Sequence, residues 1–71
     1  MIRCIVKGTI SDAEVACADH GIVPHNVYTL NSRECIVHVE DYHRATLTKW
    51  FCETGSGDPA PYPAGTLLYH T

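Results

Sequence analysis

Apolar and polar side chains alternate over residues 33–40, and a second run of this kind covers residues 2–10. A period of two is typical of strands with two different faces, so these runs predict the main strands of a sheet. One face is apolar and consists of Ile2, Cys4, Val6, Cys35, Val37 and Val39. The other face is mixed and consists of Arg3, Ile5, Lys7, Glu34, Ile36, His38 and Glu40. A sheet of this kind needs helical cover on its apolar face only.

A first helix is predicted from Ser11 to about His20. Ser11 and Glu14 fit the capping box, in which each side chain accepts from the other residue's backbone N–H. Gly21 is the expected left-handed stop, and Ile22 is expected to pack back on the helix end. The stripe that faces the core is made of small side chains and comprises Ala13, Ala16, Cys17 and His20.

A second helix is predicted over residues 42–54, with Asp41 as its N-cap and Gly55 as its stop. Its core-facing side chains lie at helical spacing and are Leu47, Trp50 and Phe51. Shorter strands are predicted at residues 27–30 and 66–71. Asn31 and Ser32 form the expected hairpin turn, and three prolines in the loop 55–65 favour an extended polyproline conformation.

The resulting order, βαββαβ, resembles the ferredoxin-like arrangement over the whole chain. The resemblance is one of pattern and rests on no family motif. It implies an α+β fold with a four-stranded sheet and two helices on one face. Because the chain has only 71 residues, we expect a single domain over residues 1–71. We also expect the first and third strands to lie parallel in the centre, with the second and fourth at the edges.

Charge and composition exclude several classes of function. The net charge is −3 and the five basic side chains are scattered, which argues against a nucleic-acid partner. There is no apolar run of about 18 residues, so no membrane span is predicted. The first ten residues lack the features of a secretion signal. We therefore expect a cytoplasmic protein whose four cysteines are thiols.

The positions of the cysteines and histidines bear on metal and enzyme chemistry. Cys17 and His20 have the spacing of a ligand pair on a helix, whereas Cys35 and His38 would point to opposite faces of a strand. The expected roles are structural, and we expect no metal site and no cofactor. No cysteine is predicted at a helix N-terminus, where a thiolate would be favoured. No catalytic motif is present, so the chain is not expected to be an enzyme.

The mixed sheet face remains as the candidate site. RNA-binding sheets stack bases on aromatic side chains of the central strands, where this chain has Ile5 and Ile36. A protein partner, or a second copy packing sheet to sheet, suits the mixed face better, and a face that is simply solvated is the equal alternative. The final strand also forms an edge of the sheet, and no residue there obviously prevents another strand from pairing with it. The predicted partner-binding residues are Arg3, Ile5, Lys7, Ile36, His38, Tyr62 and Tyr69.

The expected function is that of a non-enzymatic interaction protein that binds and modulates or inhibits a larger protein. In size and acidity the chain is similar to small inhibitors from phages and other mobile elements, of which anti-CRISPR proteins are the best known. The alternatives are a small-molecule- or metal-binding module, with His20, His25, His38 and His43 as candidates, and an oligomerising subunit without ligand. If His38 or His43 lies in an interface, binding should weaken toward about pH 6.

Overall fold

β1 (Ile2–Lys7) and β3 (Glu34–Val39) form the centre of a four-stranded antiparallel sheet. The computed structural model describes residues 1–54 and 62–71. β2 (Asn26–Thr29) and β4 (Leu67–His70) are the edges, in the order β2-β3-β1-β4. The predicted centre and edges are confirmed.

The predicted parallel pairing of the central strands is wrong, because β1 and β3 pair antiparallel from Ile2↔Val39 to Lys7↔Glu34. The crossover through the first helix makes β2, not β3, parallel to β1. The hairpin between β2 and β3 then reverses the chain once more, so β3 enters the gap between β2 and β1 antiparallel to both.

The first helix, α1 (Ile10–Asp19), begins earlier than the Ser11 cap predicts. Thr9 is the N-cap: its Oγ1 accepts from the backbone N–H of Asp12 at 3.2 Å, and Asp12 Oδ2 accepts from the Thr9 N–H at 3.0 Å. Both Thr9-x-x-Asp12 and Ser11-x-x-Glu14 fit the capping-box pattern. Gly8, at φ 109°, turns the chain out of β1 directly before Thr9 and so decides between them.

The end of α1 is as predicted. Gly21 has φ 72°, and its N–H donates to Ala18 O at 3.0 Å. The N–H of Ile22 donates to Cys17 O at 2.8 Å, which completes a Schellman motif. Ile22 is buried against the core, where it fixes the angle at which the chain leaves the helix.

The second helical segment consists of a 3₁₀ turn, η1 (Asp41–His43), followed by α2 (Arg44–Thr54). Asp41 is not the predicted side-chain cap. Its Oδ1 lies 2.8 Å from the ammonium of Met1, and this hydrogen bond and the charge of the ammonium lower the pKa of Asp41. The predicted stop Gly55, and the loop prolines 59 and 61, lie outside the described residues.

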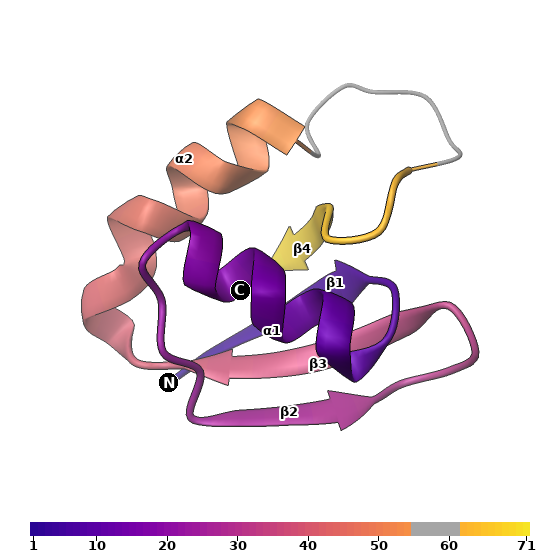
Figure 1. The fold of residues 1–71 in the computed structure, drawn as a ribbon. Helices are drawn as coiled ribbons and strands as arrows, with labels where there is room; N and C mark the ends of the chain where they lie inside the picture. Colours follow the sequence, from indigo (N-terminus) through magenta and orange to yellow (C-terminus); the bar gives the residue numbers. More distant parts are fainter. Residues whose placement is uncertain (55–61) are drawn as a thin grey trace.

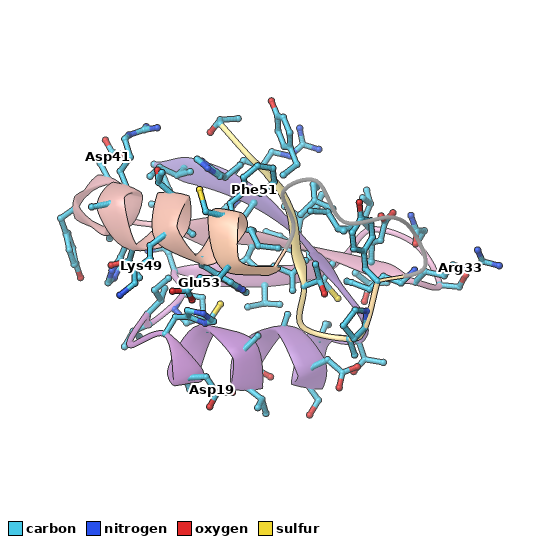
Figure 2. All side chains as sticks on the ribbon, turned by 90° about the horizontal axis from the view of Figure 1, so that it is seen from above. Asp19, Arg33, Asp41, Lys49, Phe51 and Glu53 are labelled. Atoms are coloured by element: carbon cyan, nitrogen blue, oxygen red, sulfur yellow. The ribbon has the colours of Figure 1, made fainter. Side chains whose placement is uncertain are left out.

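The core lies between the sheet and the helices, which Figure 1 shows on the same side of the sheet. Figure 2 looks down onto α1 and α2. The predicted anchors Leu47 and Trp50 are buried, and Phe51 packs partly against the same cluster. The buried apolar residues of the described chain are Ile2, Cys4, Val6, Ala13, Ala16, Cys17, Ile22, Cys35, Val37, Val39, Leu47, Trp50 and Leu67. No helix of the described residues covers the opposite face of the sheet, and we call this face the open face.

Candidate functional site: the open face of the sheet

Four apolar side chains form a row across the open face, one from each strand. Tyr28 is the register partner of Ile36, Ile36 of Ile5, and Ile5 of Tyr69. Residues directly opposite each other in a sheet share one face, so the four side chains are neighbours. Three strand spacings separate the two tyrosines, or about 14 Å. We call this set the apolar row.

The two ends of the apolar row are its most accessible part. Tyr28 is 48 % exposed and Tyr69 is 53 % exposed, whereas Ile5 and Ile36 are half-buried between them. Two tyrosines on the edge strands thus flank an aliphatic centre. A tyrosine combines a large apolar area with a polar tip, which suits a surface that is wet when free and covered when bound.

Polar residues border the apolar row on one side. Arg3 is the register partner of His38, and His38 that of Asn26. The ring of His38 meets Tyr28 edge to face, with 5.5 Å between centroids. At the edge, the backbone N–H of Arg3 donates to Thr71 Oγ1 at 3.2 Å. This border holds donors, acceptors and one permanent positive charge.

The other border of the apolar row is an oppositely charged pair. Lys7 and Glu34 are register partners on the central strands. Asn31 Nδ2 donates to Glu34 Oε1 at 2.8 Å, which holds the carboxylate at the hairpin end of the sheet. The open face therefore has an apolar centre, a basic and polar border near Arg3, and a border of mixed charge at Lys7 and Glu34.

The structure brings most of the predicted binding residues together. Those that lie on the open face are Arg3, Ile5, Lys7, Ile36, His38 and Tyr69. Tyr62 lies in the connection before β4, is half-buried and has no place in the strand register. The same connection continues to Gly65, where an added Cβ would lie 3.3 Å from Cβ of Ala16 on α1. Tyr62 is therefore not part of the apolar row.

Tyr28 is the functional candidate that the sequence analysis missed. A two-residue turn at Asn31 and Ser32 would pair residue 28 with residue 35 and turn Tyr28 toward the core. The turn is one residue longer: the Leu30 N–H donates to Glu34 O at 3.0 Å, and Arg33 N–H donates to Asn31 Oδ1 at 2.8 Å. This shift by one residue moves Tyr28 to the open face.

The two Cys–His pairs with metal-ligand spacing have structural contacts in the fold. The ring of His20 stacks on Trp50 with 4.5 Å between centroids, and its Nδ1 lies 2.9 Å from Ala16 O. Cys35 Sγ donates to Gly8 O at 3.2 Å on the core side, whereas His38 lies on the open face, so the two point to opposite faces of β3 as predicted. Within residues 1–54 and 62–71, no three His, Cys, Asp or Glu side chains are grouped to hold a metal ion.

The buried cysteines are poor nucleophiles and poor ligands. Burial raises the pKa of Cys4 to about 12 and that of Cys17 to about 11, and it also raises the pKa of Cys35. A thiol of this kind stays protonated at neutral pH, whereas the thiolate is the reactive form. Cys52 on α2 is exposed.

We expect iodoacetamide at pH 8 to modify the folded protein rapidly at Cys52 alone. Cys4, Cys17 and Cys35 are buried and held as thiols, so they react only after unfolding. Intact-mass spectrometry over time checks this result, with the urea-unfolded protein as the control that takes up four labels. Rapid labelling of a second cysteine in the folded protein would contradict the described core.

No family model, curated protein or solved structure matches the chain. In the described residues no helix is long and apolar enough to span a membrane. The open face itself is therefore the feature from which a function is proposed.

Proposed function

We propose that the chain is a non-enzymatic interaction protein of ferredoxin-like type, which binds a larger protein through its open face. The observation that carries this proposal is the apolar row. Four apolar side chains lie side by side on the sheet face opposite both helices, and its two tyrosines are about half exposed. Contiguous apolar surface with a polar border is typical of interaction sites.

The chemistry of the open face fits a protein better than a nucleic acid. Tyrosine is enriched among the residues that dominate the energy of protein interfaces, and charge is depleted at the centre of such interfaces. Here the centre is Ile5 and Ile36, and charged groups of both signs stand at the borders. A strand of nucleic acid would require a consistently basic face, and Glu34 and the net charge of −3 oppose it.

Binding at this face would act by covering a surface of the partner. A protein of 7.8 kDa can block access to a site or hold a partner in one conformation without contributing a catalytic group. Small inhibitors encoded by phages work in this manner, and we place the chain in that functional class. The proposed setting is a reducing cytoplasm, where the four free cysteines persist as thiols.

The test compares three immobilised baits: the unchanged chain, the double variant Tyr28→Ala with Tyr69→Ala, and the control Tyr42→Ala. Tyr42 is 79 % exposed on η1, so the control removes one exposed aromatic ring away from the open face. A tyrosine that becomes buried in an interface commonly contributes about 1 kcal/mol or more, so loss of both tyrosines should weaken binding of a partner at least about tenfold.

The proposal predicts a protein that the unchanged chain and the Tyr42→Ala control retain equally and that the double variant loses. Circular dichroism of the three baits confirms that all are folded. Equal retention by all three baits would show that the partner binds elsewhere, and the open face would then have no role in binding.

A further inference from the structure

We infer that a second copy of this chain packs on the open face, about a twofold axis that runs parallel to β1 and β3. The apolar row has the order Tyr28, Ile36, Ile5, Tyr69, so it presents the same residue types from either end. A twofold axis between the central strands places Ile5 over Ile36 of the second copy. It also places Tyr28 over Tyr69 of the second copy. A self-complementary patch is what a twofold interface requires.

The charges select this axis. With the axis parallel to the strands, Lys7 faces Glu34 of the second copy, and Glu34 faces Lys7. With an axis perpendicular to the strands, Lys7 would face Arg3 of the second copy and repel it. Because these residues lie on the two central strands, the rotation of about 30° between packed sheets leaves them close to the axis.

The other border is compatible with the same arrangement. Arg3 would face His38 of the second copy and not another arginine or lysine. The groups around His38 within its own copy are the ring of Tyr28, Arg3 on β1, Asn26 on β2, and Glu40, which lies 3.5 Å from His25. The attractive pairs in this dimer are thus the two Lys7–Glu34 contacts that the symmetry generates.

The interface is small. About ten side chains per copy lie on or beside the open face, fewer than the 20–30 residues a side of a standard interface. We therefore expect a dimer that forms in the micromolar range or more weakly. This inference does not require the larger partner, although both would use one face, so self-association would compete with partner binding.

The experiment is sedimentation equilibrium from low micromolar to millimolar protein, at low salt. The variants are Lys7→Glu, Glu34→Lys, and both changes together. Each single variant should dimerise at least about tenfold more weakly, because two facing pairs become like-charged. The double variant should dimerise about as well as the unchanged chain, because each facing pair is again oppositely charged, with the two signs exchanged. Lys49→Glu is the control for Lys7→Glu, because it changes the charge equally but lies on α2, where Figure 2 labels it.

Mixing the two single variants gives the decisive result. A Lys7→Glu copy carries two acids and a Glu34→Lys copy two bases, so an equimolar mixture should form heterodimers although neither variant dimerises well alone. Lys7 and Glu34 are also neighbours within one copy, and mixing cannot repair a defect inside a copy. Recovery on mixing therefore supports a contact between copies.

Two results would overturn the inference: a monomer throughout the concentration range, or a mixture that stays monomeric while circular dichroism shows both variants folded. Neither result concerns the larger partner, which the bait experiment tests separately. If the bait experiment fails but the dimer forms, the proposed partner binding is wrong and the dimer stands. If the dimer does not form but the bait experiment succeeds, the dimer is wrong and the partner binding stands.

Discussion

Replacing Trp50 by Ala should leave the protein largely unfolded at 25 °C. Trp50 is 1 % exposed, and its ring stacks on His20 in the core between α2 and the sheet. Truncating a buried Trp to Ala costs about 3–5 kcal/mol, through lost transfer free energy and the cavity left behind. A single core of this size supplies a net stability of only about 3–5 kcal/mol. One substitution thus removes most of the free energy of unfolding.

Far-UV circular dichroism and a urea titration measure this effect. Tyr42→Ala is the matched control, because Tyr42 is 79 % exposed and its loss should change stability by no more than about 0.5 kcal/mol. A Trp50→Ala protein with a cooperative transition close to that of the control would contradict the described core.

Gly8→Ala should have the second largest effect. At φ 109° a residue with a Cβ is strained, and an added Cβ would lie 2.7 Å from Oδ2 of Asp12. That oxygen accepts from the Thr9 N–H and completes the cap of α1. The substitution combines strain of about 1–3 kcal/mol with the loss of a cap worth about 0.5–2 kcal/mol.

Gly21→Ala is the control for this prediction. Gly21 also has a positive φ, 72°, but an added Cβ would meet nothing within 4 Å. It should therefore show backbone strain alone, about 1 kcal/mol, so Gly8→Ala should be the more destabilising of the two because it adds the clash with Asp12. Thermal unfolding checks both variants, with about 4–8 °C expected per kcal/mol for a domain of this size. Equal midpoints would contradict the cap geometry.

The sequence was sufficient for features that have a local cause. Alternation in the central strands predicts which side chains face the core, because the period of a strand is fixed by its backbone. Gly21 and Ile22 predict the end of α1, because a glycine followed by an apolar residue is typical of the motif that ends a helix. Five of the seven predicted binding residues follow from alternation in the central strands, and these five lie on the open face, as does Tyr69 of the final strand.

Features that depend on choosing between equal local signals were not predictable. Two capping patterns overlap at Thr9 and Ser11, and the conformation of Gly8 decides between them. The hairpin turn differs from the predicted one by a single residue, which moves Tyr28 to the other face of the sheet. The relative directions of the strands depend on the path of the whole chain, so no local pattern predicts them. Tyr28 was therefore missed although its neighbours were found.

The most direct test of the claim that a second copy packs on the open face is a dilution series of ¹⁵N amide NMR spectra. From low micromolar to millimolar protein, we expect the amide signals of Tyr28, Ile36, Ile5 and Tyr69 to shift progressively. The signals of Lys7 and Glu34 should shift over the same concentration range. The amide signals of residues on α1 and α2, such as Asp19 and Lys49 labelled in Figure 2, should not shift with concentration. Shifts confined to α1 and α2, or spectra that do not change with concentration, would contradict it.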